Sequence, residues 1–414
     1  MWTRSRFFDL SLRTFVVCAC LLAIWESWKF MRSDELFWQD TPDSIRAAIR
    51  LEPDCWWCYM QLARMDEGSA EKLLQTSLQL NSYNSDAAID LGLRYEFDGD
   101  LPRAEKLLLR AVEVDRTYAP RWTLANFYFR HDSMSAFWTW ARRATEMPTN
   151  DIGALLELCW RASPDPPTIE ANIVEENPSV LRQFVDFLIN KDQVKAAVHP
   201  ALRLVSVGYR GADYTVHGRS DRELLFTVID RLIGVDDDAD ATLLWHELIR
   251  QHWVVADTTI PNNPQFARNP LPVSFDWNFP TYGGINSWPG SAGLITEFTG
   301  DEPEGVTIAE QTIVLPAGNY KLESSFRTQD IPPDTGIRWE ISEAKWEIGD
   351  SNSDPVLASS ASLSSDTLAH VAMPFSVAQG NSLLYLRLAY HRELGTARLS
   401  GTLVVPSIRI QALP

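Results

Sequence analysis

A chain of 414 residues, 45% hydrophobic and 22% charged, is long enough for two or three domains and has the composition of a folded protein. The formal net charge of −18 argues against nucleic acid as a partner, because polyanion binding needs basic patches and the chain has no run of lysine or arginine. Five cysteines are too few for a disulfide scaffold.

The N-terminus has the features of a short signal anchor. The segment "MWTRSRFFDLSLR" carries three arginines and one aspartate, and the uncharged run "TFVVCACLLAIW" follows it. This run is shorter than the roughly 20 apolar residues of a full span, yet no small-x-small cleavage site comes after it. Trp25 and Trp28 suit an aromatic belt, and the arginines keep an N-terminus cytoplasmic. We predict a cytoplasmic tail and transmembrane anchor over residues 1–33, with a cleaved signal peptide and a buried soluble helix as alternatives.

A helical repeat follows the anchor. In "SDAAIDLGLRYEFDGDLPRAEKLLLRAVEVDRTYAP", small and large residues recur in an order that resembles the tetratricopeptide repeat (TPR), with Leu91-Gly92 in the first helix and Gly99-Asp100 at the turn. We predict TPR repeats over residues 34–151. Residues 152–257 keep helical spacing without the consensus and are predicted as degenerate repeats that continue the solenoid, with the proline-rich stretch 162–178 as a connection.

The repeat register places first-helix residues on the concave side of such an array. These groove candidates for a protein partner are Ile89, Leu93, Phe97, Thr123, Phe127 and Arg130. Packing against a neighbouring repeat is the alternative role for the apolar ones.

Two motifs resemble metal or redox sites, but their sequence context or spacing does not fit such a site. Cys55 and Cys58 open a helix after the proline that closes a repeat; they lack the βαβ context of a redox motif and a second ligand pair for zinc. We interpret them as structural, and a local disulfide between them requires an oxidising compartment. His246 and His252 are six residues apart and cannot form the four-residue spacing of a zinc-protease helix. No metal and no cofactor is predicted.

The composition changes at residues 258–272, where proline and asparagine dominate and we predict a linker. Short alternating segments with turn signals then predict an antiparallel β-sandwich (jelly roll) over residues 273–414. The order of "FDWNF", "LPAGNYKLESSFRT", "GIRWEI", "LYLRLAY" and "SGTLVVPSIRI" resembles carbohydrate-binding-module or galactose-binding-like sandwiches. Pro406 stands where that family often has an acidic residue, which departs from a calcium or ligand role. The predicted fold class is thus multidomain, α then β: a signal-anchor helix, a TPR-like solenoid and a sandwich.

The resemblance implies glycan binding by aromatic rings, which stack on the apolar faces of sugars beside planar hydrogen-bonding groups. Any one of these rings can equally belong to the core. Trp288, beside proline and glycine in "YGGINSWPGSAG", is expected on an exposed loop. The glycan-binding candidates are Trp277, Trp288, Trp339, Arg338, Tyr385 and Arg387, with Trp346 and Tyr390 as further rings.

Three function classes remain. The first is a non-catalytic, membrane-anchored periplasmic scaffold whose repeats bind protein and whose sandwich binds glycan; this layout resembles TPR proteins of bacterial exopolysaccharide or cell-envelope assembly, held in the inner membrane. The second is a protein-only adaptor with a structural sandwich. The third is a carbohydrate-active hydrolase or lyase, which is less favoured because no spacing singles out a pair of carboxylates.

Overall fold

The computed structural model contains two compact units, Met1–Ile173 and Val174–Pro414, which we describe separately. For residues 2–12, 215–216 and 382, only the backbone is described. The structure describes residues 2–147, 151–174, 177–208, 215–216, 219–257, 259–343, 355–378 and 382–414.

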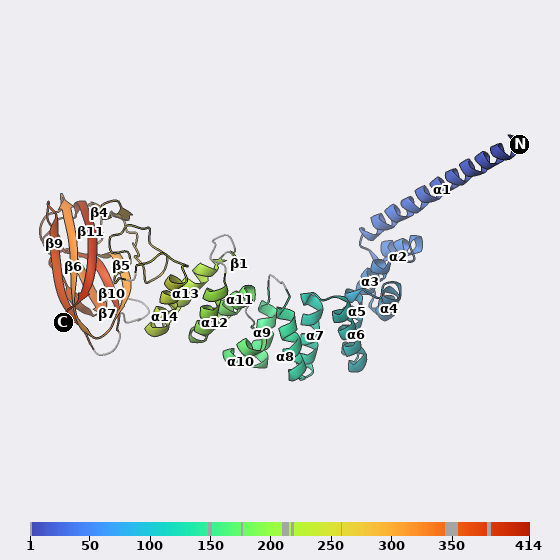
Figure 1. Cartoon of the computed structure of the whole chain (residues 1–414), viewed down its shortest axis with the longest axis horizontal. Helices are drawn as coiled ribbons and strands as arrows, with labels where there is room; N and C mark the ends of the chain where they lie inside the picture. The colour runs from blue at the N-terminus through green and yellow to red at the C-terminus, as the bar shows by residue number, and fades with distance from the viewer. Residues whose placement is uncertain are drawn as a thin grey trace. The chain divides into compact units, whose positions relative to one another are not determined.

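The first unit is helical. Its helices follow one another as antiparallel neighbours in chain order (Figure 1). They are α1 (Trp2–Phe37), α2 (Pro42–Leu51), α3 (Trp56–Met65), α4 (Ala70–Leu80), α5 (Ser85–Phe97), α6 (Leu101–Val114), α7 (Tyr118–Arg130), α8 (Met134–Thr145), α9 (Gly153–Ala162) and α10 (Pro166–Ile173), with a short 3-10 turn at Glu67–Ser69.

Helix α1 is continuous from the predicted anchor into the first repeat. The predicted boundary at residue 33 falls inside this helix. Ser33 is buried, and its hydroxyl donates to the carbonyl of Ala48 in α2 at 3.5 Å. Leu36 and Phe37 pack beside the same buried cluster. The last turns of α1 therefore serve as the first helix of the first helix pair.

The turns inside five of the helix pairs each place one residue in the left-handed region of backbone space. Gly99 has φ +83°, as the sequence predicted for the turn between α5 and α6. Asp40, Asp132, Asp192 and Asp236 take φ between 50° and 56° at the corresponding turns of other pairs. Aspartate tolerates this conformation better than most residues, so it replaces glycine there. Because Asp192 and Asp236 lie in the second unit, the same hairpin device recurs beyond the clear repeats.

The small residues of the best repeat lie where two helices cross. A Cβ added to Gly92 of α5 would lie 3.1 Å from Leu108 Cγ of α6. Ala104 and Leu108 are fully buried in this crossing. The chain from 85 to 114 is therefore a close-packed helical hairpin of the TPR kind.

The second unit begins with helices and continues into two antiparallel sheets. One sheet has the order β5-β10-β7-β8 and the other β3-β4-β11-β6-β9 (Figure 1). The helices are α11 (Pro178–Asn190), α12 (Val194–Val207), α13 (Asp221–Ile233) and α14 (Asp238–Arg250), with a two-residue pair β1 (Thr215–Val216) and β2 (Arg219–Ser220). The strands are β3 (Ile285–Gly290), β4 (Gly293–Thr299), β5 (Gly305–Leu315), β6 (Gly318–Gln329), β7 (Ile337–Glu343), β8 (Val356–Ser359), β9 (Ala369–Val377), β10 (Ser382–His391) and β11 (Ser400–Ala412).

The inner faces of the two sheets share one hydrophobic core. Alternate residues of β10, Leu384, Leu386 and Leu388, are fully buried in it. Trp339 of β7 and Leu322 of β6 join the same core from either sheet. This alternation is the period-two pattern that predicted the strands.

The predicted linker is an ordered part of the second unit. Residues 259–279, named the connecting segment here, carry Phe266, Asp276 and Trp277 in buried positions. Its end pairs with the edge strand β5: Asn278 N donates to Glu310 O at 2.8 Å, and Glu310 N donates back to Asn278 O at 2.9 Å. Pairing of this kind covers a sheet edge that would otherwise be open. The compact units divide at Ile173–Val174, so the predicted linker 258–272 lies within the second unit.

One smaller expectation is also corrected. The proline-rich stretch contains helix α10, because Pro166 and Pro167 stand in its first turn, where a missing N–H costs nothing. The acidic run 236–240 leads into helix α14. Asp237 caps that helix and its side chain accepts from Asp240 N.

Candidate functional site

The groove candidates of the first unit divide into exposed and buried residues. Phe97 is 91% exposed and Leu93 37% exposed, one helical turn apart on α5. Phe127 is only 4% exposed, and Ile89 packs against the cluster that contains it. Thr123 donates to Ala119 O within its own helix at 2.9 Å. Leu93 and Phe97 therefore present the apolar surface, whereas Phe127 belongs to the core.

Arg130, the remaining groove candidate, holds a carboxylate of the preceding repeat. Its guanidinium donates two hydrogen bonds to Glu96 of α5, each 2.7 Å long. His131 Nε2 lies 2.9 Å from Glu96 Oε1. Burial by itself raises the pKa of Glu96, but the hydrogen bonds from Arg130 and His131 outweigh it and lower that pKa below its usual value.

A row of arginines was missed by the sequence reasoning. One arginine stands in the last turn of each of four successive first helices: Arg64 of α3, Arg94 of α5, Arg130 of α7 and Arg161 of α9. The spacing of this one residue type at the ends of the first helices was the available signal. We name these arginines together with Leu93 and Phe97 the arginine stripe.

Each arginine of the stripe contacts a neighbouring repeat. Arg64 donates to Asp90 at 3.0 Å, and Arg94 donates to the Glu67 carbonyl at 2.9 Å. The guanidinium of Arg161 lies 5.4 Å from the ring centroid of Phe129. The stripe thus follows the first helices from α3 to α9.

The rings proposed for glycan stacking lie mostly in the core. Trp339 and Tyr390 are fully buried and Trp277 is 2% exposed, so their faces are unavailable to a sugar. Trp277 packs between Phe266 and Trp339. Sequence periodicity cannot distinguish a core ring from a platform ring, because both alternate in the same way. Trp346 lies outside the described residues.

The other predicted residues of the sheets are placed as follows. Trp288 is 38% exposed but lies on the edge strand β3 rather than on a loop. Arg338 is half-buried and pairs with Glu340 at 2.9 Å. Arg387 is buried, donates to Glu310 at 2.5 Å, and lies 4.3 Å from the ring centroid of Tyr385. Tyr385 and Arg387 therefore come together, and Trp288 belongs to the opposite sheet.

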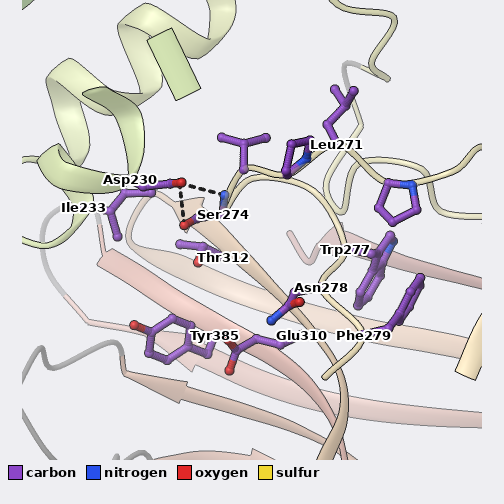
Figure 2. Close-up of a pocket in the computed structure, with 13 residues that line it drawn as sticks. Asp230, Ile233, Leu271, Ser274, Trp277, Asn278, Phe279, Glu310, Thr312 and Tyr385 are labelled. Atoms are coloured by element: carbon purple, nitrogen blue, oxygen red, sulfur yellow. Dashed lines mark hydrogen bonds between the residues drawn. The ribbon is translucent and has the colours of Figure 1, made fainter. Parts of the chain in front are cut away.

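A cleft of about 520 Å³ lies over Tyr385, between helix α13, the connecting segment and the outer face of β5 and β10. Figure 2 shows Tyr385, Glu310 and Thr312 on the sheet side and Asp230 and Ile233 on the helix side. Its volume falls in the range of about 300–1,000 Å³ of small-molecule sites. Asn278 and Phe279 of the connecting segment also line the cleft.

The helix side of the cleft is fixed by one carboxylate. Asp230 accepts hydrogen bonds from Ser274 N at 2.9 Å and from Ser274 Oγ at 2.7 Å (Figure 2). Burial raises the pKa of Asp230, and these two hydrogen bonds offset only part of that rise. The ring centroids of Trp245 in α14 and Phe275 in the connecting segment lie 6.0 Å apart. The helices and the sheets of the second unit are therefore joined by direct contacts.

The N-terminal helix offers a third surface. Residues Arg13–Phe37 form a stretch of 25 residues whose most apolar 18-residue window has a mean hydropathy of 1.4, so the helix is long and apolar enough to cross a membrane. None of its most apolar window is buried by protein. Phe15, Leu22 and Ile24 are between 64% and 71% exposed.

Comparison with known proteins finds no matching family model and no matching curated protein. Solved structures that are similar to the chain are TPR proteins. YrrB, described as a TPR protein with an unusual peptide-binding site, is 12% identical; the match covers 51% of this chain and 93% of YrrB, with a TM-score of 0.25. PilF of Pseudomonas aeruginosa is 15% identical over 55% of this chain and 92% of its own, with a TM-score of 0.25.

The C-terminal part of a TPR repeat-containing protein from Cytophaga hutchinsonii is 12% identical over 55% of this chain and 95% of its own, with a TM-score of 0.30. At these identities and TM-scores, no function is transferred from the three proteins. The TPR character of the helical region rests on its own hairpins, their left-handed turns and the crossing at Gly92.

Proposed function

We propose that this protein is a non-catalytic scaffold that is anchored in a membrane by α1 and binds a protein partner on the first-helix face of its first unit. The arginine stripe is the observation that carries the proposal, because aromatic and arginine side chains dominate the binding energy of protein interfaces. Phe97, at 91% exposure, is an anchor of this kind beside Arg94 and Arg130.

Two features support an extracytoplasmic location for the bulk of the chain. Arginines precede the apolar stretch of α1, which favours a cytoplasmic N-terminus. Cys55 and Cys58 form a disulfide, and disulfides persist in oxidising compartments. With the layout resembling exopolysaccharide or cell-envelope assembly proteins, we place the scaffold in the periplasm of a bacterium, attached to the inner membrane.

Photo-crosslinking in native membranes tests the protein-binding role. A photoreactive residue at Phe97 should yield a discrete crosslinked partner, and one at Tyr83, which is 75% exposed but precedes α5, should not. Equal crosslinking at both positions, or none at Phe97, would contradict the proposal. Replacing Leu21 and Leu22 of α1 by arginine should release the protein from carbonate-washed membranes if α1 is the anchor.

The cleft of the second unit favours glycan binding as a second function. Tyr385 and Phe279 offer ring surface there beside the polar side chains of Asn278 and Glu310, the combination that sugar binding uses. We therefore move the proposed glycan site from Trp288 and Trp277 to this cleft.

Calorimetric titration of the full chain in nanodiscs with defined neutral and acidic oligosaccharides tests the second function. Saturable binding should be lost in Tyr385→Ala and Asn278→Ala and kept in Trp288→Ala, which lies on the other sheet. If only Trp288→Ala abolished oligosaccharide binding, the glycan site would lie at Trp288, as predicted from the sequence. Absence of binding to every oligosaccharide would favour a protein-only adaptor.

A further inference from the structure

The membrane-crossing stretch of α1 passes into the first helix pair without a linker. Helix α1 is continuous over Trp2–Phe37, and the short connection to α2 makes the two helices antiparallel. The hydroxyl of Ser33 contacts the carbonyl of Ala48 in α2. Each step toward the N-terminus on α1 therefore corresponds to a step toward the C-terminus on α2. Glu52, which follows α2, comes level with Lys29 of α1.

Helix geometry gives the depth of this level in a bilayer. The uncharged run Thr14–Trp25 is about 18 Å long at about 1.5 Å per residue. A hydrocarbon layer about 30 Å thick and centred on this run ends near Lys29, and a headgroup layer of about 6 Å then reaches Ser33. If the bilayer thinned until its hydrocarbon ended at Glu26, the headgroups would still reach Phe30. Tilting of the helix moves both levels further toward the repeats.

Exposed apolar side chains on α1 continue to the same level. Trp28, Phe30 and Met31 are between 44% and 63% exposed, beside the point where the contact with α2 begins. In water they would form an apolar patch next to the repeats, whereas in a bilayer they face lipid. The charges at this level are compensated, because Lys29 pairs with Glu26 at 2.8 Å.

Two tryptophans lie at this end of the array, in residues 52–57, which we name the membrane-proximal turn. Trp56 and Trp57 open α3, and because Cβ atoms tilt toward the N-terminus of a helix, their rings lean toward this end. Both are half-buried, with ring centroids 5.5 Å apart, and Trp57 packs against the cluster that contains the Cys55–Cys58 disulfide. Indole rings suit a membrane interface because they combine an apolar body with a polar N–H.

We propose that the base of the repeat array, from the end of α1 to the start of α3, is seated in the headgroup layer, where Trp56 contacts lipid. The inference rests on the proposed anchor and adds a second lipid contact, made by the repeats themselves. This contact is apolar: Glu52 and Asp54 flank Arg50 and the rings, so the turn has no excess positive charge for anionic headgroups. Protein binding is then left to the later first helices.

Photo-crosslinking to lipid tests this seat. The photoreactive residue p-benzoylphenylalanine is placed at one position at a time in the full chain, in nanodiscs of tritiated phosphatidylcholine, and the tritium bound to the protein after irradiation is measured. Trp56 is the test position, and Leu22, 64% exposed in the membrane-crossing stretch, is the positive control. Trp38 is the matched control, because it is 79% exposed yet lies about 7 Å beyond the headgroup layer.

We expect labelling at Leu22 and Trp56 and at least about fivefold less at Trp38, although Trp38 is the more exposed ring. Adding anionic phosphatidylglycerol should leave the labelling at Trp56 unchanged. Phosphatidylcholine with shorter acyl chains thins the bilayer and should lower the labelling at Trp56 more than that at Leu22.

A second position keeps both native rings. The probe at Asp54, which is exposed on the membrane-proximal turn, should also be labelled well above Trp38. Labelling at Trp56 and Asp54 no stronger than at Trp38, with Leu22 labelled, would overturn the inference and leave the anchor in place. Absence of labelling at Leu22 as well would contradict the anchor itself. Circular dichroism verifies that each variant keeps its helices.

Discussion

At the scale of single residues, burial decides which side chains can act. Phe97 and Phe127 are both aromatic residues of first helices, yet the first is 91% exposed and the second 4%. The sequence marks both as first-helix aromatics and cannot separate them. Their difference depends on which neighbouring helix covers each ring, and contacts between repeats decide that.

Glu96 makes the stability of the first unit depend on pH. Its pKa is lowered in the folded state, so the ion pair with Arg130 is fully present above the ordinary carboxyl pKa of about 4.3 and is lost as pH falls through the lowered value. We expect Glu96→Gln to destabilise α5 and α7 by about 1 kcal/mol at pH 7 and by less at pH 3. Hydrogen exchange of amides in these helices measures the difference, and an equal loss at both pH values would contradict this cause.

The disulfide makes the first repeats sensitive to reductant. Cys55 and Cys58 are fully buried beside Ile45 and Leu62, with their Cα atoms 5.3 Å apart. Cys55→Ala with Cys58→Ala should lower the stability of these repeats by about 2 kcal/mol, the loss expected for a short closed loop. Thermal unfolding with and without reductant checks this: reductant should bring the wild type close to the variant and leave the variant unchanged. A wild type insensitive to reductant would argue against a stabilising bond.

At the scale of elements, the connecting segment organises the second unit. Gln311 of β5 is 1% exposed, and its side-chain amide makes two hydrogen bonds with the backbone of Asn262. It accepts from Asn262 N at 2.8 Å and donates to Asn262 O at 3.0 Å. Asp230 fixes the same segment to α13 through Ser274. Proline and asparagine in a stretch without periodicity indicate irregular backbone, but they do not show whether that backbone is free or docked.

Gln311→Leu tests the docking of this segment. The substitution keeps the volume and strands two buried backbone groups of Asn262, each worth about 1–3 kcal/mol. We expect the second unit to lose about 2–4 kcal/mol in urea unfolding. The amide of Asn262 should also exchange faster with solvent. Ile313→Leu on the same strand, which keeps the core apolar, is the control and should cost less than about 1.5 kcal/mol.

At the scale of the whole molecule, the helices of the second unit and its sheets form one body. The unit starts at Val174, a hundred residues or so before the sheets, because Trp245 packs on Phe275 and Asp230 holds Ser274. A compact unit with its own core can in principle fold alone.

We expect a fragment of residues 174–414 to be soluble and to unfold cooperatively. A fragment of residues 273–414, the domain predicted from sequence, removes Phe266 and Asn262 and uncovers Trp277. It should be markedly less stable or should aggregate. Size-exclusion chromatography and thermal unfolding compare the two fragments, and equal stability would show that the helices and the connecting segment contribute nothing to the fold of the sheets.

Local periodicity in the sequence determined the helical hairpin at 85–114, its left-handed turn at Gly99 and the alternating strands, because helices and strands impose their periods on neighbouring residues. It also marked an N-terminal stretch long and apolar enough to cross a membrane. Only the tertiary structure decided that Trp277 and Trp339 are core and that Tyr385 lines a cleft. These features depend on contacts between residues far apart in the chain, and no short-range pattern encodes such contacts.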